Sequence, residues 1–359
     1  MTGYNVLIPD VSRQMSPEVA LPVMDALQTL GHTPVVMEMA EIARMYQEMR
    51  YQRRGCYEIF AFYIKDLLRK HRIDFGFSVG LGIILEDYTK REAHHLLEEC
   101  GVPNIIYLHN RDSEVVAKLD ALGAREWAHT FIACTSRLLT DLLSQRGYDN
   151  VVQMLPGTSP RIFFPADSPP ENAPYPLKLE DPWLTDDYEV SFVGSYERKR
   201  DQLLCALADV GISLAIYGDD GWKQSEKLLK FWRRQANYLT DLNTIYNSSK
   251  VNLDLPHDNC LFDDYVSVRV FDCLAGQNFI TTYRRTGLED VIELDHDLIT
   301  YDSAEELVSV VKYYLSDEMA RYTTAIRGYG RIKGEAYWSN RLSQVLPRLE
   351  MHVLTSVSN

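Results

Sequence analysis

The sequence predicts a two-domain α/β protein in which each domain holds a parallel β-sheet covered by helices on both faces. Three observations lead to this fold class. The chain has 359 residues, which is the size of two ordinary domains. Short apolar runs alternate with longer helical patterns in one half of the chain and again in the other. A stretch dense in proline separates the two series.

In the first half, each strand-like apolar run is followed by a segment of helical periodicity. The expected strands are 4–8, 35–39, 75–79, 104–108 and 130–135, and the expected helices are 17–30, 41–72, 86–99, 113–122 and 136–146. Gly31, Gly101 and Gly147 follow three of these helices and suit their C-terminal caps. Parallel strands joined through a helix form right-handed crossovers, so the domain is expected to be Rossmann-like.

Residues 156–182 change the character of the chain. They contain eight of the fifteen prolines, and proline lacks the N–H group that helices and central strands need. This density predicts an extended linker. We therefore expect an N-terminal domain over residues 1–165 and a linker over 166–188.

The alternation of strands and helices restarts after the linker. The expected strands are 189–193, 213–217, 250–255, 278–282 and 298–301, and the expected helices are 200–210, 239–248, 266–275, 303–315 and 337–354. Ser303 and Glu306 have the spacing of a capping box. This pattern predicts a second Rossmann-like domain over 189–335 and a C-terminal helix within 336–359. Because parallel sheets bind ligands at the carboxyl ends of their strands, we expect the two domains to face a shared cleft that holds the site.

The composition excludes several classes of protein. A formal net charge of −14 argues against broad nucleic-acid binding, because contacts to phosphates need clustered Lys and Arg. No apolar run is long enough to span a bilayer, and the first residues lack the basic and apolar regions of a signal peptide. The six cysteines are scattered without metal-binding spacing, which is typical of reduced thiols. We therefore expect a soluble cytoplasmic protein.

Several familiar catalytic and nucleotide-binding motifs are missing from the sequence. There is no GxxxxGK[ST] phosphate-binding loop and no GxSxG nucleophile elbow. Gly80 and Gly82 match only part of a dinucleotide fingerprint, so we interpret them as a tight turn. His94 and His95 are adjacent on an expected helix and point about 100° apart, so we expect surface histidines and no zinc site.

The first candidate binding segment is 192–200, where an expected strand ends and a basic helix begins. Gly194 and Ser195 form the turn, and Arg198 and Arg200 open the helix. Backbone N–H groups at a glycine turn, the positive end of a helix and guanidinium groups together suit a pyrophosphate. The alternative interpretation is a helix start that carries surface charge.

Three more segments follow in order: the acidic turn 216–222, in which Gly218 closes a strand, then 246–255 and 267–282. With 192–200 they resemble the retaining group 1 glycosyltransferases of the GT-B fold, most closely the spore-maturation CgeB-like branch. The matching sequences are F-V-G-S before basic residues, I-Y-G-D-D-G-W, Y-N-S-S-K-V-N-L and R-V-F-D-C-L-A-G. The resemblance covers about residues 190–345 and adds Gly218 to the expected binding residues.

The resemblance implies a nucleotide-sugar site with two acidic residues eight positions apart. They fall on Asp264, expected near the sugar, and Asp272, expected near the ribose hydroxyls. Asp272 stands where the family has glutamate. Because aspartate is one methylene group shorter, contact with the ribose would require the backbone to approach the ribose more closely. Arg198 and Arg200 are expected at the pyrophosphate, and Arg269 is expected as a further polar contact or as an orienter of Asp272. The alternative for Asp272 is a pair with Arg269 on the same helix face.

The resemblance also assigns the first domain to the acceptor. His109 resembles the histidine that many group 1 enzymes place beside the donor sugar, and the alternative is a loop histidine without a role. If the enzyme instead inverts configuration, His109 or Asp112 is the candidate general base. GT-B enzymes stabilise the leaving phosphates with basic side chains and a helix end, so the resemblance implies neither a metal nor a cofactor.

The segment 41–72 is unusually basic for this acidic chain, with eight Arg or Lys residues and four Asp or Glu residues. Aromatic and aliphatic residues interleave with the charges. A basic amphipathic helix can dock on anionic lipid or on an anionic acceptor, which would give peripheral membrane contact at most. The alternative is a packed helix with a solvated face.

The predicted function is transfer of a sugar from a nucleoside diphosphate sugar to an acceptor, with retention and without a metal. One alternative is a degenerate protein of the same fold that binds a nucleotide or nucleotide sugar without turnover, and Asp272 is the residue that supports it. A nucleotide-sugar epimerase is a third alternative, but the four ordered motifs match the transferases better. The donor base, the sugar, the acceptor and the oligomeric state have no signature in the sequence.

Overall fold

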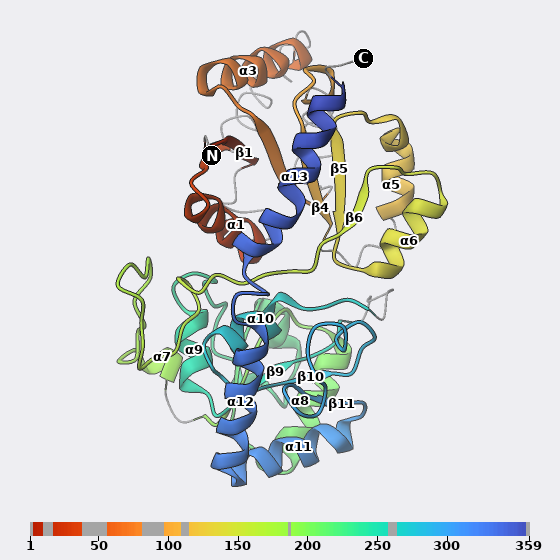
Figure 1. Ribbon diagram of the computed structural model, residues 1–359. Coiled ribbons are helices and arrows are strands. Elements are labelled where there is room, and N and C mark those ends of the chain that lie inside the picture. The colour runs from red at the N-terminus through yellow and green to blue at the C-terminus, as the bar shows by residue number, and fades with distance from the viewer. Residues whose placement is uncertain are drawn as a thin grey trace. The chain divides into compact units, whose positions relative to one another are not determined.

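The computed structural model describes residues 3–9, 17–37, 56–80, 97–108, 115–185, 188–257 and 264–356. The chain divides into two compact units, coloured along the chain in Figure 1. Unit 1 comprises Met1–Leu155 together with Trp338–Asn359, and unit 2 comprises Pro156–Tyr337. Among the described helices, none is long and apolar enough to cross a lipid bilayer.

Unit 1 is built on a six-stranded parallel sheet, in the order β2-β1-β3-β4-β5-β6. Its strands are β1 Asn5–Pro9, β2 Thr33–Met37, β3 Phe75–Val79, β4 Asn104–Leu108, β5 Thr130–Cys134 and β6 Val151–Gln153. The five strands expected from apolar runs are confirmed within a few residues. The short edge strand β6 was not expected, because it offers only three residues of pattern.

Helices flank this sheet. They are α1 Pro17–Thr29, α3 Cys56–His71, α5 Val115–Ala121, α6 Arg137–Gln145 and α13 Trp338–Ser356, with a 3-10 turn at Ala124–Glu126. Ser136 caps α6 by accepting a hydrogen bond from the Leu139 N–H at 2.9 Å. Residues 41–55 and 86–96 of the expected helices lie outside the described residues.

The C-terminal helix α13 is part of the core of unit 1. Trp338, Leu342, Val345 and Leu349 are buried against the sheet, and their spacing places them on one helix face. The Trp338 ring meets the Tyr107 ring edge-on, with ring centres 5.3 Å apart. Figure 1 shows α13 in blue, crossing the sheet next to the red α1. The last segment of the chain therefore completes the unit that the first segment begins.

Unit 2 is built on a five-stranded parallel sheet, in the order β11-β10-β9-β7-β8. Its strands are β7 Val190–Val193, β8 Leu214–Tyr217, β9 Val251–Asp254, β10 Ile280–Tyr283 and β11 Ile299–Tyr301. Its helices are α7 Pro182–Thr185, α8 Arg198–Asp209, α9 Leu242–Ser248, α10 Val268–Ala275, α11 Ala304–Ser316 and α12 Glu318–Ile332. Two 3-10 turns lie at Asp220–Gln224 and Leu229–Phe231. The second Rossmann-like unit predicted from the sequence is confirmed.

Two helices of unit 2 show which structural features a local sequence pattern can predict and which it cannot. The first half of the capping box of α11 forms as expected, since Ser303 Oγ accepts from the Glu306 N–H at 3.1 Å. Glu306 Oε2 accepts at 2.8 Å from the N–H of Asp302, one residue before the N-cap, and not from that of Ser303. No element was expected for α12, because glycines interrupt its pattern. Gly328 is required by packing, since an added Cβ would lie 2.6 Å from a Leu274 methyl group and 2.7 Å from the Asp297 carbonyl oxygen.

The proline-rich segment is not a free linker. Residues 156–181, which we call the arm, belong to unit 2, so the division of the chain falls after Leu155. Phe163 and Phe164 of the arm are buried, and the Phe163 ring contacts the rings of Tyr238 and Tyr246. Prolines keep the arm out of helices and strands, but the apolar residues between them still gain free energy by burial.

Candidate functional site

The predicted binding residues of unit 2 gather where its parallel strands end. β7, β8, β9 and β10 end at Val193, Tyr217, Asp254 and Tyr283. The ends of neighbouring parallel strands lie along one edge of a sheet, which we call the carboxyl edge of unit 2. Open α/β sheets bind ligands at this edge.

Gly194 and Gly218 let the ends of β7 and β8 approach closely. The Gly194 N–H donates to the Tyr217 carbonyl at 2.8 Å, and the Trp222 indole N–H donates to the Gly194 carbonyl at 2.9 Å. An added Cβ on Gly218 would lie 2.1 Å from the Gly194 oxygen, and one on Gly194 would lie 2.7 Å from the Phe192 ring. Both predicted glycines therefore shape the turn through the absence of a side chain.

Arg200 joins the end of β7 to the end of β9. Its Nη1 donates to both the carbonyl and the Oγ of Ser195 at 3.0 Å, and its Nε donates to the Pro256 carbonyl at 3.2 Å. Only 4% of Arg200 is exposed, whereas Arg198 at the start of the same helix is exposed. Of the two arginines expected at a pyrophosphate, Arg200 supports the turn and Arg198 is accessible to a ligand.

The N-terminus of α8 is held without a side-chain cap. Glu197 is the N-cap residue, and its side chain does not accept from the helix N–H groups. It pairs instead with Arg200 Nη1 at 3.3 Å and with His257 Nε2. The first N–H groups of a helix need partners from outside the helix, and the helix dipole makes this end positive. The N-terminal end of α8, a twelve-residue helix that begins at Arg198, is therefore positive and favours an anion.

Arg269 forms a buried ion pair with Asp254, the last residue of β9. Arg269 Nη1 lies 2.5 Å from Asp254 Oδ1, and the Thr282 hydroxyl donates to Oδ2 at 2.7 Å. Burial alone would raise the pKa of Asp254, but Arg269 and Arg285 bring it below its ordinary value. Burial also disfavours the charge on Arg269, and the neighbouring Asp254 outweighs this and raises the pKa of the guanidinium. Both groups are therefore charged.

Phe192 brings two of the predicted arginines together. The guanidinium carbon of Arg200 lies 5.5 Å from the centre of the Phe192 ring, and that of Arg269 lies 5.7 Å from it. Distances of this size allow cation–π attraction. The residues expected from two separate sequence segments thus surround one aromatic side chain at the carboxyl edge.

Asp272 lies on α10 and is 1% exposed. The Thr158 hydroxyl donates to its Oδ1 at 2.7 Å, and the Tyr238 hydroxyl donates to its Oδ2 at 3.0 Å. Arg269 pairs with Asp254 at the end of β9. Asp272 thus holds the arm, through Thr158, against the helix that carries Arg269.

Asp264 lies in the loop before α10 and is 6% exposed. It packs against Gly287 beyond the end of β10, because an added Cβ there would lie 3.3 Å from the Asp264 Cβ. Gly287 has a φ of +89°, which side chains rarely adopt. His109 and Asp112, the residues predicted for the acceptor side, lie outside the described residues.

Four charged or titratable residues of this edge were not predicted: Glu197, Asp254, His257 and Arg285. Arg285 follows β10, and its Nη1 donates to the Tyr265 carbonyl at 3.2 Å. A signal was present for two of them, since Asp254 ends the buried strand β9 and His257 follows it three residues later. A polar residue directly after a buried parallel strand faces the ligand-binding edge.

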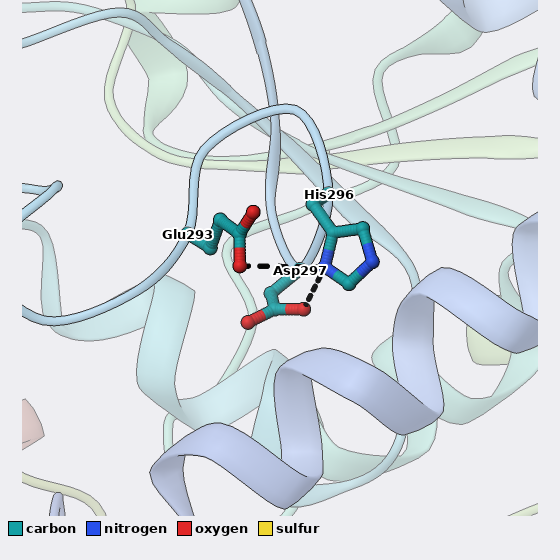
Figure 2. A group of neighbouring side chains, drawn as sticks. All are labelled: Glu293, His296 and Asp297. Carbon is teal, nitrogen blue, oxygen red and sulfur yellow. Dashed lines mark hydrogen bonds and ion pairs between the residues drawn. The ribbon is translucent and has the colours of Figure 1, made fainter.

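Glu293, His296 and Asp297 form a cluster with metal-ligand spacing at another place in unit 2. Figure 2 shows the three side chains on one loop, with His296 Nδ1 2.6 Å from Asp297 Oδ1 and 3.8 Å from Glu293 Oε2. Glu293 and His296 are exposed. The loop precedes β11, so it lies at the amino end of that strand and away from the carboxyl edge.

Comparison with known proteins agrees with this architecture. Residues 198–347 match the family model described as glycosyl transferase-like. No curated protein matches the chain. A glycosyltransferase from Rickettsia africae has 13% identity and a TM-score of 0.65, with 98% of this chain and 99% of that chain covered.

Two further structures have the same fold. Sucrose-phosphate synthase from Thermosynechococcus elongatus has 11% identity and a TM-score of 0.65, covering 98% of this chain and 100% of its own. Anabaena Alr3699/HepE, in complex with UDP and glucose, has 10% identity and a TM-score of 0.65, covering 97% of this chain and 100% of its own. The chain therefore has the GT-B fold predicted from its sequence. The family match and this fold support a glycosyltransferase.

Proposed function

We propose that the protein transfers a sugar from a nucleoside diphosphate sugar to an acceptor, with the donor bound at the carboxyl edge of unit 2. The observation that carries the proposal is the N-terminus of α8, which begins at the exposed Arg198 shortly after the glycine turn that ends β7. The exposed guanidinium of Arg198 and the positive helix end suit a diphosphate, although the chain has a net charge of −14. The UDP and glucose bound by the Anabaena protein of the same fold agree with such a donor.

In this proposal each residue has a separate task. Arg198 and the N–H groups of α8 bind the diphosphate, while Arg200 and Ser195 hold the turn in shape. Asp264 contacts the transferred sugar. Asp272 reaches the ribose only if a bound donor displaces the hydroxyl group of Thr158 or Tyr238.

The departing diphosphate needs positive charge as the bond to the sugar breaks. Side chains and a helix end supply it in this proposal, so transfer needs no metal. Retention of configuration is proposed on the resemblance to the retaining group 1 enzymes. His109 and Asp112 belong to the acceptor side. We further propose membership of the CgeB-like branch and a place in the cytoplasm, both on the motifs quoted above.

Calorimetric titration with UDP, GDP and ADP tests the donor site. We expect Arg198→Gln to weaken binding of the preferred diphosphate about tenfold, because a charge-assisted hydrogen bond is lost. Lys250→Gln is the matched control: it removes the same charge before β9, at the opposite end of the strands, and should leave affinity within about twofold. If no nucleoside diphosphate binds the unaltered protein, the donor site is misassigned.

Chemistry is tested by incubating the protein with each nucleotide sugar and following release of the diphosphate. Activity is expected to survive EDTA and to fall with Asp264→Asn. The configuration of the product, read from its anomeric proton signal, decides between retention and inversion. Loss of activity in EDTA that a divalent cation restores would contradict the metal-free proposal.

One observation favours a second candidate, a binding protein without turnover. Both oxygens of Asp272 already accept hydrogen bonds from the protein, and the residue is buried. If nucleotide diphosphates bind tightly while no nucleotide sugar is hydrolysed or transferred, the binding protein is the better description.

A further inference from the structure

A hollow of about 210 Å³ lies in unit 1, between the edge strand β6 and the helix α13. On one side it is lined by Val152, Gln153, Met154 and Leu155, which form the end of β6 and the residues after it. On the other side it is lined by Arg341, Gln344, Val345 and Arg348 of α13. The hollow therefore lies at the carboxyl end of a parallel strand, where α/β sheets bind ligands.

The lining of the hollow is cationic and polar around an apolar floor. Two of its eight residues are arginines, two are glutamines, and none of the eight is acidic. Met154 and Val345 are buried and close the floor, whereas Gln344 and Arg348 are exposed at the mouth. In a chain with fourteen more acidic than basic residues, a hollow lined by two arginines and no carboxylate favours an anionic occupant.

Helix geometry places the two arginines on one side of α13. Arg341 and Arg348 are seven residues apart, which is about two turns or 10 Å along the helix axis. Gln344 lies between them on the same side. Long arginine side chains from these positions can converge on one ligand group, and each guanidinium can donate two parallel hydrogen bonds to it.

The position of α13 is fixed by the adjacent face of the helix. Trp338, Leu342 and Leu349 are buried in the core of unit 1, so the helix cannot rotate to turn the arginines away. A rigid backbone that presents charged side chains lowers the ordering cost of binding.

The volume limits the ligand. Sites for drug-sized molecules are typically about 300–1,000 Å³, so this hollow holds a smaller group. Two guanidinium groups match the charge and the several acceptor oxygens of a phosphoryl group better than those of a single carboxylate. The apolar floor leaves room for a short carbon skeleton attached to it.

We propose that this hollow binds the phosphoryl group of a small phosphorylated ligand, at a site separate from the carboxyl edge of unit 2. Arg341 and Arg348 bind the phosphoryl oxygens, and Gln153 and Gln344 donate to them from either side. The site belongs to unit 1 alone, so it does not depend on the donor proposal for unit 2.

The test is binding of inorganic phosphate and of glucose 6-phosphate to the full chain, with glucose as the uncharged comparison. The same titrations are run on Arg198→Gln, so that phosphate binding at unit 2 is recognised by its loss in that variant. We expect both phosphates to bind and glucose not to bind. Tighter binding of glucose 6-phosphate would identify a sugar phosphate as the ligand, and equal binding would identify the free anion.

Arg348→Gln is the main variant, because Arg348 is exposed and its loss should leave folding intact. We expect it to weaken phosphate binding about tenfold, and the double variant with Arg341→Gln to abolish it. Lys70→Gln, an exposed lysine of α3 in the same unit, should change affinity less than about twofold. The proposal is overturned if neither phosphate binds, or if binding in the folded double variant equals that of the unaltered protein.

Discussion

Buried carboxylates of unit 2 lie at the carboxyl edge and at the contact with the arm. Their ion-pair and hydrogen-bond partners differ between these two regions. At the edge, Asp254 is paired with Arg269, which is itself largely shielded from water. Along the arm, Asp241 pairs with Lys178 and Arg234, each about 40% exposed, and Asp272 accepts hydrogen bonds from neutral hydroxyl groups. Charge that is paired inside the protein depends on its partner more than charge paired at the surface.

The difference indicates separate purposes. The edge holds two arginines around one ring, close to where a diphosphate would bind, and a mutual pair fixes one of them there. The arm is fastened near its start by Thr158 and near its end by Lys178. These contacts are spread along the chain, so each should contribute less. Three substitutions rank the two regions.

The largest effect is expected for Arg269→Met. It leaves the buried Asp254 without its charged partner, and loss of one member of a buried pair typically destabilises by about 3–5 kcal/mol. The free energy of unfolding in urea measures this loss. The double variant Asp254→Asn with Arg269→Met removes both charges and should lose distinctly less. A single-variant loss below about 1 kcal/mol would mean that water reaches Asp254.

An intermediate effect with a defined pH dependence is expected at Asp241. Burial raises its pKa, but the Asn237 N–H, Lys178, Thr240 and Arg234 outweigh burial and bring the pKa to about 2. An unfolded aspartate titrates near pH 3.9, so the folded state binds its proton less readily. The resulting stabilisation of about 2 kcal/mol is present above pH ~4 and disappears as the pH falls to ~2.

Asp241→Asn should therefore lower stability at pH 7 and flatten its decline between pH ~4 and ~2. Urea unfolding at a series of pH values measures both slopes. Asp167→Asn, on the exposed surface of the arm, is the control and should leave the slope unchanged. If Asp241→Asn and the unaltered protein showed identical slopes, another carboxylate would be responsible for the loss of stability at acid pH.

The smallest effect is expected for Thr158→Val, which keeps the shape of the side chain and removes its hydroxyl group. Asp272 then loses one donor but keeps Tyr238. A loss of about 1 kcal/mol is expected from unfolding curves. Tyr238→Phe removes the other donor and should act similarly. If Thr158→Val proved as harmful as Arg269→Met, the arm would matter to stability as much as the edge does.

The sequence predicted the fold well because its elements follow local periodicity. Apolar runs such as 104–108 and capping pairs such as Ser303 with Glu306 determine structure within a few residues. The helix α12 was missed because Gly328 is selected by contact with Leu274 and the Asp297 carbonyl, which no local pattern reveals.

The sequence predicted several residues of the candidate site, but few of the contacts between them. The segments around Gly194 and Arg269 were identified, and they do meet around Phe192. The partner of Asp272 could not be found in this way, because Thr158 lies 114 residues earlier in the chain. The pairing of Arg269 with Asp254 was not expected, because only the folded sheet brings the end of β9 to α10.

The place of α13 in unit 1 has a consequence for synthesis on the ribosome. The core of unit 1 includes Trp338, Leu342 and Leu349, which are translated only after every residue of unit 2. The apolar face of the nascent N-terminal sheet therefore stays exposed while unit 2 is synthesised and folds. A chain that stops before residue 338 would leave that face uncovered, so an early stop should harm the first unit more than the second.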